Sequence, residues 1–188
     1  IIRLSIQNRT MRRKKQAIKA VHYNRGTAAA YRRALLRLID QMHASTVYWI
    51  SAAYRANPPA LAQDARPIDE VNRRMRELFK RWKRVFYGEA AKIAERYIDG
   101  QFRNTDRALM AELERVGWAI KPVITPAMRE ALEAGIAANV ALIKSIPDRY
   151  FEQIEGHVMR AYQNGMDLYT LTRQIEELGH STRKRAEL

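Results

Sequence analysis

Two long segments of this chain repeat apolar residues at the period of an α-helix, and that periodicity limits the folds open to it. The first stripe recurs at spacings of three, four or seven and consists of Tyr31, Leu35, Leu38, Ile39, Met42, Trp49 and Ala53. The second consists of Val71, Met75, Leu78, Phe79, Trp82, Phe86, Ile93 and Tyr97. Stripes of similar length predict an antiparallel hairpin in which two long helices bury each other.

Capping residues, prolines and glycines predict where the helices of the first half begin and end. Thr27 is expected to cap the first helix, and Asn57 to end it because two prolines follow. After a loop over residues 58–67, the second helix is expected to reach residue 99. A shorter helix is expected to follow to residue 116, with Asn104 or Thr105 as its cap and Gly117 as its stop.

The second half of the chain is predicted to contain an extended segment and four shorter helices. Residues 118–124 are β-prone but include Pro122, which predicts an edge strand or an extended linker. Thr125 followed by Pro126 is a helix start, and that helix is expected to stop before Pro147. The remaining signals are a start at Pro147–Asp148, a stop at Asn164–Gly165, a cap at Asp167, a stop at Gly179 and a cap at Ser181.

These elements predict an all-α protein in three parts. Residues 1–26 form a basic, extended N-terminal arm that Gly26 ends. Residues 27–117 form the long antiparallel hairpin and the short helix, and residues 118–188 form a smaller C-terminal helical bundle. The last predicted helix is still continuing at Leu188, so the helical region is expected to extend beyond it.

Charge is unevenly distributed along the chain. Residues 1–25 carry eight basic side chains and no acid, residues 26–124 carry eighteen basic and eleven acidic, and residues 125–188 carry eight and nine. The three segments therefore hold +8, +7 and −1 of the net +14. A basic half joined to a nearly neutral half predicts that one end meets a polyanion and the other meets protein.

Three groups of basic residues are candidates for contact with an anion. The arm favours a nucleic acid or an acidic protein surface, two alternatives that the sequence leaves open, through Arg9, Arg12, Arg13, Lys14, Lys15, Lys19 and Arg25. The cations of residues 73–84 favour a solvated helix face, because acids are interleaved with them. A third group, which follows the predicted cap at Ser181 and would oppose the helix dipole there, consists of Arg183, Lys184 and Arg185.

No arrangement of residues indicates catalysis or a bound cofactor. Cysteine is absent, which excludes a disulfide scaffold, a thiol nucleophile and a cysteine-based zinc site. The four histidines lack the spacing of a metal site, and the aromatic residues follow the apolar stripes. We therefore expect neither an enzyme nor a metal or cofactor site in this chain. No apolar run approaches the roughly 20 residues that cross a bilayer, and no membrane partner is expected.

The amino-acid sequence of the last fifty residues resembles the head-morphogenesis region of phage Mu F-like minor head proteins. The matching phrases are NVALIKSIP at residues 139–147, VMRAYQNGMDLYTLT at 158–172 and GHSTRKRAEL at 179–188. A weaker similarity to the same family lies upstream at Tyr31–Leu36, at Tyr48–Trp49 and at Ala52–Pro59. No single phrase is a catalytic signature. The resemblance is specific because the phrases occur in the same order as in that family.

The resemblance implies a structural minor capsid protein of a tailed bacteriophage. Such a protein sits at the portal vertex of the virion in several copies, after assembly in the host cytoplasm, and assists head assembly and DNA packaging or delivery. Its implied partners are the portal protein, the major capsid protein and packaged double-stranded DNA. The residues expected to contact the portal or a neighbouring subunit are Ile143, Ile146, Pro147, Tyr150, Met159, Tyr162, Leu168 and Leu171.

Two other functions compete with this interpretation. One is a DNA-binding accessory protein of packaging or recombination, which would bind naked DNA alone with a steep dependence on salt. The other is an enzyme whose catalytic part follows Leu188. A membrane-active role ranks last.

Overall fold

The computed structural model describes residues 18–59, 66–118 and 123–187. These residues form four helices: α1 (Arg25–Ala56), α2 (Arg66–Arg115), α3 (Pro126–Gln163) and α4 (Leu168–Glu187). The described part of the chain contains no strand, so the predicted all-α class is confirmed. The predicted edge strand is not formed by residues 118 and 123–124, and residues 119–122 lie outside the described ranges.

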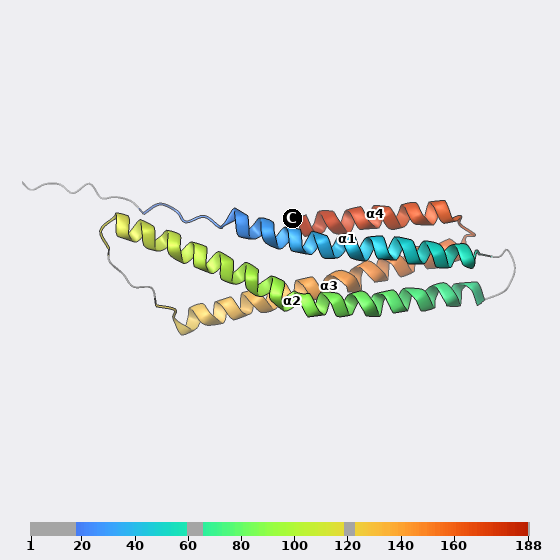
Figure 1. Ribbon diagram of the computed structural model, residues 1–188, viewed down its shortest axis with the longest axis horizontal. Helices are drawn as coiled ribbons and strands as arrows, with labels where there is room; N and C mark the ends of the chain where they lie inside the picture. Colours follow the sequence, from blue (N-terminus) through green and yellow to red (C-terminus); the bar gives the residue numbers. More distant parts are fainter. Residues whose placement is uncertain (1–17, 60–65, 119–122, 188) are drawn as a thin grey trace, which may run out of the picture.

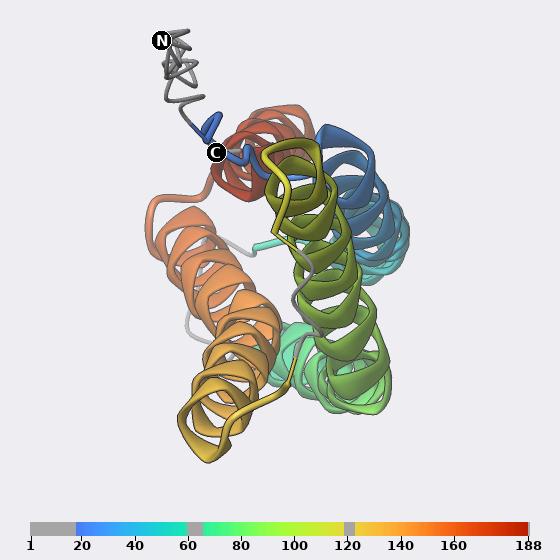
Figure 2. The same cartoon turned by 90° about the vertical axis from the view of Figure 1, so that its left-hand side faces the viewer.

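The four helices form an elongated bundle in which each helix runs antiparallel to its two neighbours (Figures 1 and 2). Lys83 of α2 is paired with Asp148 of α3 at 3.0 Å, and Arg183 of α4 is paired with Asp40 of α1 at 2.7 Å. Helices α1 and α2 lie side by side in opposite directions, so the predicted hairpin is present, and α3 and α4 complete the up-down-up-down arrangement.

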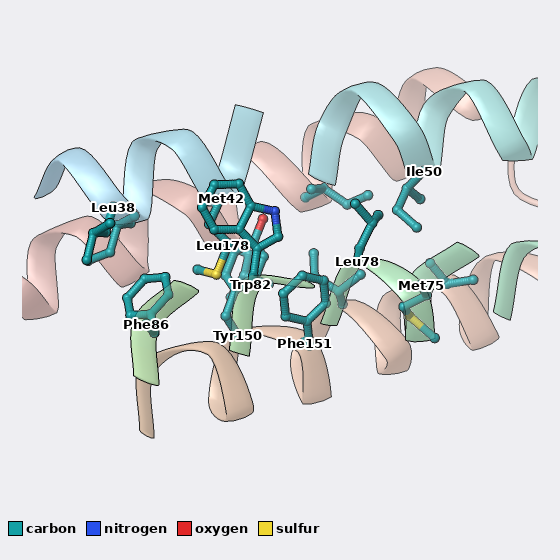
Figure 3. Packing of buried hydrophobic residues seen from close by; sticks show 14 of the residues in the cluster. Leu38, Met42, Ile50, Met75, Leu78, Trp82, Phe86, Tyr150, Phe151 and Leu178 are labelled. Carbon is teal, nitrogen blue, oxygen red and sulfur yellow. The ribbon is translucent and has the colours of Figure 1, made fainter. Parts of the chain in front are cut away.

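One hydrophobic core runs through the bundle and takes residues from all four helices. Figure 3 shows Trp82 of α2 at its centre, near Met42 of α1, Tyr150 of α3 and Leu178 of α4. The predicted boundary between residues 117 and 118 falls in the connection between α2 and α3, and the helices on both sides of it contribute to this shared core.

The start of α1 differs from the prediction. Asn24, not Thr27, is the cap: its Oδ1 accepts a hydrogen bond from the Thr27 N–H at 2.8 Å, and Gly26 lies inside the helix. Asn24 is also fixed to α2, because its N–H donates to Oε1 of Gln101 at 2.8 Å and its carbonyl accepts from Nε2 at 3.0 Å. Residues 18–24 of the predicted arm therefore connect with α2, and residues 1–17 lie outside the described ranges.

Helix α2 is continuous where a break was predicted near residue 100. Asn104 does not cap a new helix; its Nδ2 donates to the Gly100 carbonyl one turn earlier at 2.6 Å. This bond satisfies the side chain inside the helix and removes its tendency to end one. The predicted stop at Gly117 is confirmed, with a φ of 87° and with the Trp118 N–H bonded to the Leu113 carbonyl at 2.9 Å.

Helix α3 begins as predicted but continues through Pro147. Thr125 caps it, accepting from the Met128 N–H at 3.2 Å. Pro147 has no N–H to donate to the Ile143 carbonyl, yet it lies inside the helix and is buried. Ile143, Pro147 and Tyr150 share one buried face, so packing in the core that all four helices share holds α3 together across the missing bond.

Helix α4 begins as predicted and then passes both of its expected boundaries. Asp167 caps it, accepting from the Thr170 N–H at 3.0 Å. Ser181 is not a cap, since its hydroxyl donates to the Leu178 carbonyl at 3.0 Å within the helix. Gly179 is buried against the imidazole ring of His43 on α1, and a Cβ at this position would stand 2.5 Å from Nδ1 and from Nε2. Close helix contact, not helix termination, explains this glycine.

His43 predicts a pH dependence of stability. Its Nδ1 lies 2.9 Å from the Tyr150 hydroxyl, and it faces Asp40 on its own helix and Glu176 and His180 on α4. Burial lowers the pKa of His43 below its ordinary value of 6.5, with smaller opposing effects from the two carboxylates. As pH falls below 6.5, His43 therefore takes up a proton more readily in the unfolded chain than in the native protein.

We expect the free energy of unfolding contributed by this site to be complete above pH 6.5 and to fall as pH drops toward the lowered pKa. Urea unfolding at several pH values should show this loss, and the variant His43→Gln should flatten the slope between pH 6.5 and 5. An equivalent change at the exposed His22, His22→Gln, should leave the slope as it is. Identical slopes in wild type and His43→Gln would show that His43 is not responsible.

Candidate partner-docking groove

The last turns of α4 lie beside the first half of α1 and the middle of α3. Helix α4 has 20 residues, whereas α1 has 32 and α3, its other neighbour, has 38. Figure 1 shows α4 ending beside α1 before the first turns of α1 are reached.

Two hollows surround the end of α4. The first, of about 190 Å³, lies between α1, α3 and α4, with Leu35, Leu142 and Ile146 among its apolar walls. The second, more open hollow, of about 710 Å³, lies along the first three turns of α1. They meet at Tyr31 and at Ala186 of α4, both of which line each hollow. We refer to the two together as the α4-end groove.

The α4-end groove combines an apolar floor with a basic rim. Leu142 is 54% exposed there, an unusual position for a leucine inside a long bundle. Among the described residues that line it, Glu187 is the only acid, and it is already paired with Arg32 at 3.3 Å. The basic side chains of the lining are Arg25, Arg32, Arg33, Arg149 and Arg185.

Tyr31 is held rigidly where the two hollows meet. Its hydroxyl donates to Oδ1 of Asn139 on α3 at 3.0 Å, and its ring centroid lies 4.5 Å from that of Tyr97 on α2. Burial raises the pKa of Tyr31, so the phenol stays neutral and keeps donating. The floor of the groove is therefore pre-formed, and its arginines supply the charge.

The eight residues predicted to contact the portal divide into interior and accessible positions. Ile143, Pro147 and Leu171 are buried in the core, where they support the helices, and Tyr150 is buried as well but lines the first hollow of the α4-end groove. Ile146 is half-buried and lines the α4-end groove. The other three, Met159, Tyr162 and Leu168, are half-buried away from the groove lining.

Tyr162 and its neighbour Tyr54 join α1 to the end of α3. The Tyr162 hydroxyl donates to the Asn57 carbonyl, and the Tyr54 hydroxyl donates to the Met166 carbonyl at 2.6 Å. Burial raises the pKa of Tyr162 to about 12. These bonds close the turn between α3 and α4, which gives Tyr162 a structural role in addition to its predicted contact.

The residues predicted to bind an anion are dispersed. Lys19 is exposed and its N–H donates to Glu112 of α2 at 3.4 Å, while Arg25 and Arg185 line the α4-end groove. Arg183 is paired with Asp40, and Lys184 is exposed in the last turn of α4. Outside the described ranges lie Arg9, Arg12, Arg13, Lys14 and Lys15.

The cluster from Ser181 to Arg185 lies at the opposite helix end from the one predicted. It occupies the last turns of α4, so its cations complement the helix dipole, and there is no helix N-terminus here to hold a phosphate. The predicted helix start at Ser181 is therefore wrong, whereas contact of Arg183, Lys184 and Arg185 with an anion stays a prediction. The error came from assigning Ser181 as a helix cap. Helix α4 is continuous there, and the Ser181 hydroxyl bonds to the Leu178 carbonyl within it.

The basic residues of α2 include a paired group and an unpaired group. Arg73 and Arg74 form ion pairs with Glu70 and Glu77 at 2.5–3.7 Å, which agrees with the predicted solvated face. In the described part of the chain, no ion pair involves three exposed cations of the next turns, Lys80, Arg81 and Arg84.

Three aromatic residues that the periodicity assigned to the core are exposed: Tyr48, Trp49 and Trp118. Trp49 was assigned to the buried stripe, but its side chain is 41% exposed and Ile50 takes the core position. Trp49 lies edge-on to Tyr48, which is 65% exposed, with the guanidinium of Arg74 5.9 Å from its ring centroid. Trp49 and Ile50 are both apolar, so the periodic stripe alone could not show which of the two is buried.

The α4-end groove itself was missed by the sequence analysis. Leu142, Ile146 and Arg149 lie at spacings of four and three, so they share one face of α3. That spacing was the available signal. It could not be interpreted because Pro147 was expected to end the helix between Ile146 and Arg149.

Two further features are absent from the part of the chain that the structure describes. No three His, Asp or Glu side chains in it lie close enough to hold a metal ion. None of its helices is long and apolar enough to cross a membrane.

Comparison with known proteins adds one short similarity. No protein-family model matches the chain, and no solved structure matches it. An uncharacterized protein of Haemophilus influenzae is 39% identical over 62 residues, which is 33% of this chain and 14% of that protein. The chain thus spans a small part of the length of this relative.

Proposed function

We propose that this protein is a structural component of a bacteriophage head, bound at the portal vertex. One observation carries the proposal. Two of the phrases that resemble Mu F-like minor head proteins, residues 139–147 and 179–188, lie on different helices and both line the α4-end groove. Leu142 and Ile146 come from the first phrase, and Arg185 and Ala186 from the second. A shared surface is what a docking role for these phrases requires.

In this role the groove binds the portal protein or a neighbouring subunit. The basic arm and the unpaired cations of α2 then lie toward packaged DNA or acidic surfaces of the head. The rigid bundle connects these two sides. Helix α2 alone, with 50 residues, is about 75 Å long at 1.5 Å per residue.

Co-purification with the portal protein of the same phage tests the proposal. We expect the full chain to be retained by a tagged portal protein through gel filtration at moderate salt. A variant without residues 1–17 keeps the Asn24 cap of α1 and should remain folded. We expect it to be retained as well, because the groove is intact. Failure of the full chain to be retained would contradict the proposal.

A DNA-binding accessory protein is the second candidate, favoured by the exposed cations of α2 that lack ion pairs, Lys80, Arg81 and Arg84. Binding of the isolated chain to duplex DNA, measured from about 50 to 200 mM salt, distinguishes the two. Tight binding with a steep salt slope, together with no portal complex, would replace the first proposal by this one.

A further inference from the structure

We propose that the side of the bundle formed by α1 and α2 binds single-stranded nucleic acid, with bases stacked on aromatic rings of α1 and phosphates held by cations of α2. We refer to this site as the Trp49 patch, which consists of Tyr48, Trp49, Lys80, Arg81 and Arg84. The inference goes beyond the proposed function and does not depend on it, because the patch shares no residue with the lining of the α4-end groove.

Two adjacent aromatic side chains of α1 are exposed in this patch. Tyr48 is 65% exposed and Trp49 is 41% exposed, and their rings meet edge-on with centroids 5.0 Å apart. Neither ring belongs to the core, in which Ile50 takes the next position along the helix. Exposed rings beside cations are the surface on which proteins stack the bases of an unpaired strand.

A hollow of about 230 Å³ lies beside Trp49, between α1 and α2. Its lining consists of Trp49, Arg74, Glu77, Leu78 and Arg81. Leu78 belongs to the core and separates the hollow from it. The hollow is smaller than the pockets that hold drug-sized molecules, so its size suits a single base. Because Arg81 lines the same hollow as Trp49, a base on the Trp49 ring would have a guanidinium within reach of its phosphate.

Three exposed cations of the patch form no ion pair in the described part of the chain, and these are Lys80, Arg81 and Arg84. Glu77 is the only acid among the residues that line the hollow, and it is paired with Arg73 and Arg74 at 2.8 and 3.2 Å. Cations spaced three and four residues apart on a helix repel each other. A bound polyanion would remove this repulsion, and its phosphates would displace counterions from the patch.

The rings and the cations together favour an unpaired strand over other anionic partners. Duplex DNA offers its phosphates to the cations but hides the faces of its bases, so Tyr48 and Trp49 would stay uncovered. A membrane surface is bound by a continuous apolar helix face, which is wider than two adjacent rings. A single strand supplies both the phosphates and the open base faces.

Titration of the full chain with a thymidine oligomer tests the inference. The probe is a fluorescein-labelled oligothymidine of about 12 nucleotides, and its control is an abasic oligomer of the same length, which keeps the phosphates and lacks the bases. Fluorescence anisotropy should show that the abasic oligomer binds at least about fivefold more weakly. In the variant Trp118→Phe, where the other remaining tryptophan, Trp82, is buried, oligothymidine should also quench the emission of Trp49.

Variants of the ring assign the stacking to the patch. Trp49→Ala should weaken the binding of oligothymidine at least about fivefold and leave the binding of the abasic oligomer unchanged. Trp49→Phe keeps an aromatic face and should retain most of the affinity. The control Trp118→Ala alters a tryptophan that is 61% exposed just past the end of α2, roughly 45 Å along that helix from Arg84, and it should bind as the wild type does.

A matched pair of charge reversals assigns the phosphate contacts. Arg81→Glu with Arg84→Glu should weaken the binding of both oligomers by about tenfold or more and reduce its dependence on salt. Arg103→Glu with Arg107→Glu makes the same change of net charge at exposed residues farther along α2. This control should change the affinity less than about twofold, because charges are screened beyond about 10 Å at roughly 0.1 M salt. Circular dichroism and thermal unfolding should match the wild type in every variant.

Three results would overturn the inference. In the first, oligothymidine binds no better than the abasic oligomer. In the second, Trp49→Ala binds oligothymidine as tightly as the wild type does, which would leave the cations to duplex DNA. In the third, vesicles of phosphatidylcholine and phosphatidylglycerol shift the emission of Trp49 and oligothymidine does not, which would assign the patch to a membrane surface. None of these results bears on retention by the portal protein, so the proposed function is tested separately.

Discussion

Replacing Ile143 by alanine is expected to lower the free energy of unfolding by about 2–5 kcal/mol, the usual cost of emptying a fully buried aliphatic site. Ile143 has an exposed fraction of 0% and lies in the core that all four helices share. It also precedes Pro147 by one turn, where α3 lacks a main-chain hydrogen bond, so packing must hold the helix together. Urea unfolding followed by circular dichroism measures the change.

The adjacent residue is the matched control. Leu142→Ala removes a comparable volume from a side chain that is 54% exposed, and it should change stability by no more than about 0.5 kcal/mol. The same variant should weaken partner binding if the groove is used. Ile143→Ala with near wild-type stability would mean that α3 is not packed as described, and Ile143 would return to the set of surface contacts.

Replacing Gly179 by alanine is expected to destabilise the protein by about 1–3 kcal/mol, the range for overpacking a core. Intrinsic helix propensity predicts the opposite sign, since alanine is favoured over glycine by about 1 kcal/mol inside a helix. Sterics should prevail because the added Cβ would overlap the His43 ring, which burial and the Tyr150 hydroxyl hold in place. Thermal and urea unfolding measure the result.

Two variants make this interpretation testable. Gly88→Ala adds a Cβ with nothing within 4 Å, so it should stabilise the protein by about 0.5–1 kcal/mol through propensity alone. Removing the opposing ring in the pair Gly179→Ala and His43→Ala should recover much of the loss caused by Gly179→Ala, a non-additivity that a double-mutant cycle detects. Additive effects would show that the ring is not the obstacle.

The sequence predicts where the long helices lie and which of their faces are buried, because single exceptions do not remove the helical period of the apolar residues. The stripes at residues 31–53 and 71–97 gave the α1–α2 hairpin, and Thr125, Asp167 and Gly117 were assigned correctly as ends. Each of these three residues makes its bonds within a few positions of itself. Local chemistry alone therefore determines them.

The helix ends that were wrong depend on contacts with distant residues. Asn104 lies beside Thr27, Pro147 is held by the shared core, and Gly179 is set by His43 on another helix. A sequence pattern contains none of these neighbours, so each residue was given its usual meaning as a helix boundary. The groove was hidden for the same reason, since its walls come from residues of α1, α3 and α4 that lie far apart in the sequence.

The antiparallel order of the bundle gives the molecule two unlike poles. The end of α1, the start of α2 and the turn from α3 to α4 lie at one pole, where Tyr54 and Tyr162 join α1 to that turn. Residues 18–24 and the α4-end groove lie toward the other. The 20 residues of α4 separate the groove from the first pole by about 30 Å. A fluorophore or a tether attached near Tyr54 and Tyr162 would therefore lie about 30 Å from the groove and would not obstruct a docked partner.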